Sequence, residues 1–213
     1  MPAARRQPHR QRTFARGATW VRNSLGPCLL LAWILASVPG CSSRTSTGFQ
    51  ALDLDGKLTT LDSGPKGTAC VFVFLGVECP IANRCLPELV ALETELGPQG
   101  VRFHHIYPNA DETPEAIHRH RAEYGLNSAA YRDPTLGLAR TLGASKTPEA
   151  VALSSNGELI YQGRINDQFA ALGIGKPEPT RHDLADALRG FLRGAPHVGR
   201  GPPAVGCSFR ALP

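Results

Sequence analysis

The stretch that most restricts the fold of this chain is an uninterrupted apolar run that leads at once into a helix-like pattern. The run, Ala69-Cys-Val-Phe-Val-Phe-Leu75, is apolar at successive positions, which suits a strand buried on both faces. Between Cys79 and Gly97, apolar residues recur at helical spacing: Ala82, Cys85, Leu86, Leu89, Leu92 and Leu96. A doubly covered strand that passes directly into a helix indicates an α/β protein with a central sheet.

The remaining chain continues this alternation of strands and helices. The predicted elements are an opening strand near Phe49–Leu54, a strand at 101–107, a helix at 114–124, a short helix from Asp133-Pro134 to Gly143, a hairpin at 150–153 and 159–162, and a last helix at about 180–193. Apart from the opening strand, their order is β-α-β-α-α-β-β-α. This order predicts an α/β sandwich whose sheet is mixed.

The first forty residues carry the basic excess of the chain and have the pattern of an export signal. Six of the 23 basic residues are arginines within 1–40, where no acidic residue lies, so the rest of the chain holds 17 basic and 18 acidic residues. A nearly neutral body argues against a nucleic-acid partner. The apolar stretch 28–38 matches the core of a secretory signal and is shorter than the ~20 residues of a membrane span. We therefore expect export to the periplasm or cell envelope.

Cys41 follows the apolar stretch and opens a polar tether at 41–48. The segment Val38-Pro39-Gly40-Cys41 resembles the lipid-attachment box of bacterial lipoproteins, although Pro39 replaces the small residue usual there. That resemblance implies lipidation of Cys41 and a membrane anchor, with plain cleavage or an uncleaved leader as the alternatives. The expected organisation is a leader at 1–40, the tether, one domain at 49–193 and a Gly/Pro-rich tail at 194–213.

Cys79 stands where the buried strand gives way to the helix, a position that favours a reactive thiolate. The unpaired N–H groups and the positive dipole end of a helix N-terminus lower the pKa of a cysteine. Pro80 suits the first turn, because its missing N–H would have no partner inside the helix. Glu78 acts in the opposite direction, since a neighbouring carboxylate disfavours the thiolate. Cys79 is the candidate nucleophile, and packing in the core is the alternative use of such a cysteine.

The order of these features resembles the thioredoxin-like superfamily, specifically its redoxin branch of the alkyl hydroperoxide reductase and thiol-specific antioxidant type, over roughly 49–192. In this family a core strand delivers the active-site cysteine and a proline lies eight residues later in the helix, as Cys79 and Pro87 do here. The family also has a cis-proline before the next strand, and Thr147-Pro148 occupies that place. The resemblance implies a thioredoxin-like three-layer sandwich, with a central mixed β-sheet and helices on both faces.

The same resemblance implies a substrate-docking edge at Thr147, Pro148 and Pro80. A cis-proline fixes the backbone beside the sulfur, so that the Thr147 amide and carbonyl form a strand edge on which an extended substrate can pair. Position 82, where thioredoxins carry their second cysteine, holds Ala82. A mixed disulfide on Cys79 therefore needs a more distant cysteine to resolve it.

Three cysteines are candidates for this resolving role or for a structural bond. Cys85 is nearest in sequence, but six residues along a helix is a rotation of ~240°, so pairing with Cys79 requires the first turn to unwind. The alternative for Cys85 is a packing role in the core beside Leu86 and Leu89. Cys207 lies on a tail that can span up to ~40 Å and so reach the site or another chain. Cys70 begins the central strand, where we expect it to lie in the core, and it could pair with Cys207 as a structural staple. Four cysteines allow three full pairings, which the sequence does not distinguish.

These observations predict an exported thiol–disulfide oxidoreductase that acts on protein or small-molecule thiols and disulfides. Cys79 forms a mixed disulfide, and Cys85 or Cys207 releases it. We expect an electron-donating thiol partner and no organic cofactor, because sulfur itself carries the electrons. A thiol-dependent peroxidase of the same family is an alternative. It is weakened because Gly76 and Phe72 stand where peroxiredoxins have Thr and Pro.

A Cu(I)-binding, chaperone-like module on the same fold is the other alternative, because soft thiolates select Cu(I). Copper chaperones of this fold use Cys-x-x-x-Cys, whereas five residues separate Cys79 from Cys85. Candidate third ligands are His104, His105, His182 and His197, and spacing fixes none of them. We expect these histidines to be solvated surface groups, and we predict no metal site.

Overall fold

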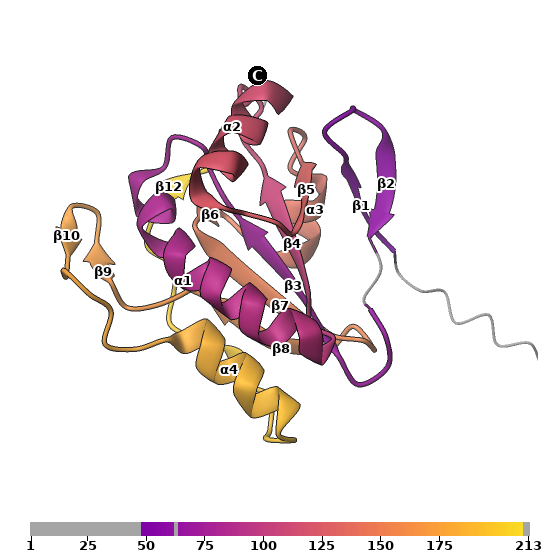
Figure 1. The fold of residues 1–213 in the computed structure, drawn as a ribbon, viewed down its shortest axis with the longest axis vertical. Helices are drawn as coiled ribbons and strands as arrows, with labels where there is room; N and C mark the ends of the chain where they lie inside the picture. Colours follow the sequence, from indigo (N-terminus) through magenta and orange to yellow (C-terminus); the bar gives the residue numbers. More distant parts are fainter. Residues whose placement is uncertain (1–47, 62–63, 211–213) are drawn as a thin grey trace, which may run out of the picture. The chain divides into compact units, whose positions relative to one another are not determined.

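The central strand of the sheet is β3 (Ala69–Phe74), in which every residue is buried, as its apolar run predicts. It pairs in parallel with β4 (Arg102–Tyr107) and antiparallel with β7 (Glu149–Ser154), so the sheet is mixed. The structure is a computed structural model that describes residues 48–61 and 64–210 (Figure 1). The predicted leader and Cys41 lie outside the described residues.

The sheet has eight strands in the order β11-β8-β7-β3-β4-β5-β1-β2. The strands not yet named are β1 (Phe49–Leu52), β2 (Leu58–Leu61), β5 (Ala129–Arg132), β8 (Leu159–Gly163) and β11 (Gly199–Arg200). Two smaller pairs lie beside it: β9 (Phe169–Ala171) with β10 (Ile174–Gly175), and β6 (Lys146–Thr147) with β12 (Cys207–Ser208).

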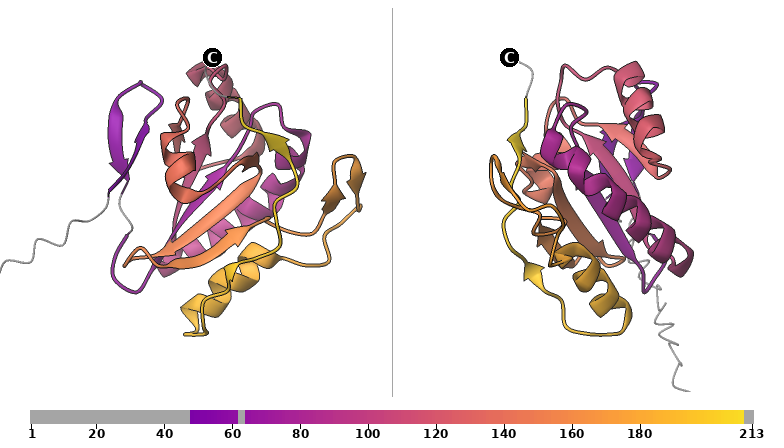
Figure 2. Two further views of the ribbon diagram at one scale, coloured as in Figure 1. Left: turned by 180° about the vertical axis from the view of Figure 1, so that it is seen from behind. Right: turned by 60° about the vertical axis from the view of Figure 1, so that its left-hand side comes forward.

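Helices cover both faces of the sheet, which confirms the predicted three-layer fold. The helices are α1 (Pro80–Leu96), α2 (Pro114–Tyr124), α3 (Gly137–Leu142) and α4 (Asp183–Leu192), and a 3-10 turn, η1 (Gly97–Gln99), follows α1. Side chains of β3 alternate between two core clusters: Val71 and Val73 pack with α1, α2 and α4, whereas Phe72 and Phe74 pack with α3. Figure 2 shows α3 on the opposite side of the sheet from α1.

The helices differ from the predicted ones at two N-termini, and a buried carboxylate explains each difference. The carboxylate of Asp133 accepts a hydrogen bond from Ala139 N, so the chain turns before α3 begins at Gly137. The carboxylate of Asp167 accepts from the main-chain N–H groups of Thr180 and Arg181, which holds these residues out of α4. Strand β5 was not predicted, because four residues with one buried position give too short a pattern.

The expectation that His104 and His105 are solvated is wrong, since they are 7% and 0% exposed. Both lie on β4, which is covered on its two faces by the two core clusters. The His104 ring stacks on Phe72 at 5.5 Å between centroids, and His105 Nε2 pairs with a carboxylate oxygen of Glu93. Helical cover on both faces of the sheet therefore places these rings in the interior.

The C-terminal segment returns to the sheet rather than leaving it (Figure 2). It first lies in parallel beside β8, where Gly201 N donates to Gln162 O at 2.9 Å and Arg164 N donates to Pro202 O at 3.1 Å. It then pairs antiparallel with β6 through β12. No helix among the described residues has the length and apolar character that a membrane span requires.

Candidate active site

Cys79 is the N-cap of α1, where its side chain faces the first unpaired N–H groups of the helix. Its Sγ accepts a hydrogen bond from Ala82 N at 3.5 Å, and its backbone is extended at φ −82° and ψ 105°. Pro80 is the first residue of the helix, where a missing N–H costs nothing. Cys79 is only 4% exposed, whereas the neighbouring Glu78 is exposed. The helix terminus therefore acts on the sulfur at close range.

The peptide bond between Thr147 and Pro148 is cis, and it lies against Cys79. The Thr147 carbonyl oxygen is 3.0 Å from Cys79 Sγ. Gly76 lies against both residues, because a Cβ at that position would lie 3.2 Å from Thr147 Oγ1, a tight contact, and 3.4 Å from Cys79 Cβ. The glycine that stands in place of a peroxiredoxin threonine thus gives room to the side chain of Thr147.

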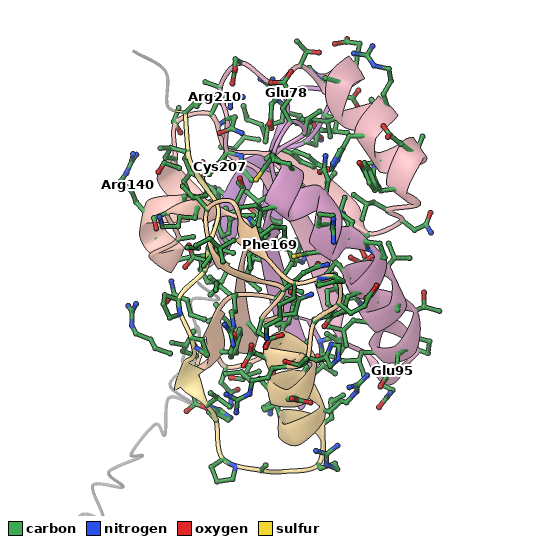
Figure 3. All side chains as sticks on the ribbon, turned by 90° about the vertical axis from the view of Figure 1, so that its left-hand side faces the viewer. Glu78, Glu95, Arg140, Phe169, Cys207 and Arg210 are labelled. Atoms are coloured by element: carbon green, nitrogen blue, oxygen red, sulfur yellow. The ribbon has the colours of Figure 1, made fainter. Side chains whose placement is uncertain are left out.

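Cys207 lies directly beside Cys79, on the strand that pairs with the cis-proline segment. The two Sγ atoms are 3.1 Å apart, which exceeds the ~2.05 Å of a disulfide, so both sulfurs are thiols or thiolates here. In the β6–β12 ladder Cys207 is the partner of Thr147, and Ser208 is the partner of Lys146. Figure 3 shows Cys207 next to the start of α1, at the end of the molecule where Glu78 and Arg210 lie.

The two sulfurs have opposite electrostatic environments. Burial of Cys79 disfavours its thiolate. Hydrogen bonds from the Thr147 side chain, the Ala82 main-chain N–H and Cys207 outweigh that effect and hold the pKa of Cys79 below its usual value. Burial, the hydrogen bond to Cys79 and the charge of Cys79 raise the pKa of Cys207 to about 11. The environment therefore favours ionisation of Cys79 over ionisation of Cys207.

Cys85 belongs to a different part of the interior. It is 3% exposed, and its Sγ lies 3.8 Å from Asn166 Oδ1. Burial, with the charges of Glu88 and Cys79, raises the pKa of Cys85 to about 12, which keeps it protonated at neutral pH. Helix α1 runs from Pro80 past Cys85, so its first turn is wound.

The suggested staple between Cys70 and Cys207 does not match the structure. Cys70 is buried in the core cluster that contains α3, whereas Cys207 packs against the cluster that contains Cys79. Alternation of side chains along β3 places Cys70 on the face opposite to that cluster. Cys207 is therefore beside the candidate nucleophile rather than beside Cys70.

A buried polar pair, Asn109 and Glu112, supports the site and was not singled out from the sequence. Glu112 Oε1 accepts hydrogen bonds from Val77 N and from Asn109 Nδ2, both at 2.8 Å. Asn109 Oδ1 accepts from Arg210 N at 2.9 Å, which fixes the chain just after β12. Acidic residues before α2 look in the sequence like ordinary helix-start acids. The sequence feature that could have indicated the pair is the polar residue Asn109, three positions before Glu112.

In the ranges 48–61 and 64–210, no group of three or more His, Cys, Asp and Glu side chains is placed to hold a metal ion. His182 pairs with Glu88, and the ring of His197 packs on Phe191. The residues weighed as copper ligands therefore make other contacts.

Comparison with solved structures identifies the fold. An uncharacterised conserved protein from Geobacillus kaustophilus is 24% identical with a TM-score of 0.68, covering 79% of this chain and 90% of that chain. A hypothetical protein from Sinorhizobium meliloti 1021 is 23% identical with a TM-score of 0.67, covering 78% and 92%. A thiol:disulfide interchange protein of the thioredoxin family from Chlorobium tepidum TLS is 18% identical with a TM-score of 0.50, covering 68% and 93%.

No protein-family model matches the chain, and a comparison with curated proteins finds no match. The likeness to solved structures is therefore one of fold, and it shows a thioredoxin-like fold in agreement with the resemblance seen in the sequence.

Proposed function

We propose that this chain, whose fold is thioredoxin-like, is an exported thiol–disulfide oxidoreductase with Cys79 as nucleophile and Cys207 as resolving cysteine. The observation that carries the proposal is the 3.1 Å separation of the two sulfurs, together with their opposite pKa shifts. The nucleophile in thiol–disulfide exchange is a thiolate. The lowered pKa of Cys79 beside the raised pKa of Cys207 makes Cys79 the sulfur that ionises more readily.

The reaction proceeds in two exchanges. The Cys79 thiolate attacks one sulfur of a substrate disulfide, forming a mixed disulfide while the other substrate sulfur leaves as a thiolate and takes up a proton. Cys207 then loses its proton and attacks Cys79 Sγ, forming the Cys79–Cys207 disulfide while the second substrate sulfur leaves. The substrate gains two electrons from the dithiol, and an electron-donating dithiol partner restores Cys79 and Cys207. Run in reverse, the same exchanges oxidise a substrate dithiol.

Thr147 and Pro148 supply the edge on which a polypeptide substrate docks. The short strand β6 ends at Thr147, whose carbonyl is beside the nucleophilic sulfur, and a two-residue strand already pairs with it there. An extended substrate that paired with Thr147 in the same way would bring its own sulfur to Cys79. Pro80, exposed on the first turn of α1, borders the same sulfur.

The proposed location is the periplasm or cell envelope, with the leader as the export signal. The support is the run of arginines before the apolar stretch 28–38 and the polar tether after it. Lipidation of Cys41 would anchor the domain to a membrane through that tether. Such a location agrees with thiol–disulfide exchange, because disulfides form and persist outside the cytosol.

Reduction of insulin disulfides by the full chain, with dithiothreitol as donor, tests the assignment. Cys79→Ser is expected to abolish reduction, and Cys207→Ser is expected to accumulate the mixed disulfide between Cys79 and substrate. Cys85→Ser is the matched control, because it removes a neighbouring buried thiol that contacts Asn166, and it should keep activity. Full turnover by Cys79→Ser would overturn the proposal. A loss of turnover in Cys85→Ser equal to that in Cys207→Ser would overturn the role of Cys207.

A further inference from the structure

The C-terminal strand lies on the edge that an external substrate needs. β12 pairs antiparallel with β6, with Cys207 opposite Thr147. The edge beside the cis-proline is therefore already occupied by a segment of the same chain. The nucleophilic Cys79 is 4% exposed beneath it. A substrate strand and β12 would require the same hydrogen-bonding groups.

The residue just before β12, Gly206, lies closer to this edge than any residue with a Cβ permits. A Cβ on Gly206 would lie 2.0 Å from the carbonyl oxygen of Thr147, 2.7 Å from its carbonyl carbon and 3.1 Å from Pro148 N. These are backbone atoms, which cannot rotate aside as the end of a flexible side chain can. Only glycine therefore fits at position 206 while β12 is paired with β6. A substrate strand cannot occupy this edge at the same time as β12.

The segment is held on both sides of Cys207. Before it, main-chain hydrogen bonds join Gly201 to Gln162 and Arg164 to Pro202. After it, Ala110 N donates to Arg210 O at 2.9 Å, and the Arg210 guanidinium pairs with the carboxylate of Asp111. β12 can be displaced if only the short segment between these two attachments moves away from β6. The attachments then keep Cys207 near Cys79.

We propose that β12 is a built-in competitor for the docking edge, so that a polypeptide substrate with an extended, cysteine-bearing segment pairs with β6 only while β12 is displaced. The proposal rests on the function proposed above. When β12 returns, Cys207 Sγ attacks Cys79 Sγ in the mixed disulfide, the Cys79–Cys207 bond forms and the bond from Cys79 to substrate breaks. The substrate sulfur leaves as a thiolate and takes up the proton that Cys207 gave up. Resolution and expulsion of the substrate strand are thus one event, and an external dithiol then reduces the enzyme.

The test uses the full chain with Cys207→Ser, which keeps β12 in place and prevents the internal disulfide. The probe is the peptide Val-Gly-Cys-Ser-Phe, identical to residues 205–209, with its cysteine activated as a thionitrobenzoate disulfide. Release of the chromophore gives the rate of mixed-disulfide formation, and mass spectrometry locates the peptide on Cys79. Gly206→Ala in this background is expected to raise the rate of mixed-disulfide formation about tenfold or more. The added Cβ displaces β12, so that a larger fraction of the molecules has an open docking edge.

Gly97→Ala in the same background is the matched control. Gly97 has φ −54° and no atom within 4 Å of an added Cβ, so the rate should not change. A stop codon at 206 gives a second variant that removes β12 altogether, and its rate should equal or exceed that of Gly206→Ala. Thermal unfolding checks that each variant is folded.

The outcomes separate the two proposals. Equal rates in the parent, Gly206→Ala and the truncated chain would overturn the competition while leaving Cys79 as nucleophile. The absence of any peptide on Cys79 in all of these variants would overturn the proposed function, and the competition with it. A rate increase confined to Gly206→Ala and the truncated chain would support both.

Discussion

The sulfurs of Cys79 and Cys207 lie 3.1 Å apart, although 128 positions separate the two residues in the chain. One caps a helix that follows the central strand, and the other lies on a two-residue strand near the C-terminus. The pairing of β12 with β6 brings them together, since it sets Cys207 opposite Thr147. The proposed redox pair thus depends on a tertiary contact rather than on a local motif.

Mild oxidation is expected to link Cys79 to Cys207, because the sulfurs need to move only about 1 Å to reach bonding distance. Closing so long a loop restricts the unfolded chain, which adds up to about 5 kcal/mol to the free energy of unfolding. The oxidised protein should therefore unfold at a higher temperature than the reduced one. Peptide mapping without reduction identifies the bond, and a bond from Cys207 to Cys85 or Cys70 would contradict this pairing.

The Cys207→Ala variant is expected to raise the pKa of Cys79, because it removes a thiol that donates to the thiolate. The rate of Cys79 alkylation by iodoacetamide should then reach half its maximum at a pH about one unit higher, as loss of a hydrogen bond to a charged group implies. Cys85→Ala serves as the control, since Cys85 makes no hydrogen bond to Cys79. Superimposable pH profiles for Cys207→Ala and the parent chain would contradict the prediction.

Glu112→Gln should stabilise the protein at neutral pH. Burial raises the pKa of Glu112, and its Oε2 makes no hydrogen bond within the described residues, so the ionised form is unfavourable in the folded state. A folded-state pKa above the unfolded value contributes stability that is present at low pH and lost as the pH rises through the folded pKa. The gain in Tm from Glu112→Gln is therefore expected at pH 7 and should shrink below about pH 4.

Glu112→Ala is the companion to that experiment, because it also removes the acceptor for Val77 N and Asn109 Nδ2. Leaving these donors unpaired should cost about 1–3 kcal/mol of unfolding free energy. A lower Tm for Glu112→Gln than for the parent at pH 7 would show that the charge itself stabilises the site.

The residue before the reacting cysteine should determine how well a peptide docks. Because a Cβ at Gly206 would lie 2.0 Å from Thr147 O, the peptide Val-Ala-Cys-Ser-Phe should form the mixed disulfide more slowly than Val-Gly-Cys-Ser-Phe. The comparison is made on the chain truncated at 206, where the edge is open. Rates for free cysteine thionitrobenzoate, which lacks a preceding residue, provide the reference for intrinsic reactivity. Equal rates for the two peptides would show that substrates do not adopt the register of β12.

The strand–helix junction at Cys79 could be predicted because its signals are local. The apolar run predicts β3, the helical spacing predicts α1, and Gly97 marks the end of that helix. The position of β12 could not be predicted, since two residues in a Gly/Pro-rich segment have no periodicity and their pairing is decided by β6. The burial of His104 and His105 could not be predicted either. Their side chains are polar, and they are buried only because β4 is covered on both faces of the sheet.

The attachments on either side of β12 also have a kinetic consequence. A thiol on a segment attached close to its target on both sides reacts as if present at millimolar or higher local concentration, whatever the composition of the surrounding solution. Glutathione-like thiols outside the molecule would have to outcompete that intramolecular partner to intercept a trapped substrate. Trapped intermediates should therefore be short-lived, and substrates should depart fully reduced rather than capped by a small thiol.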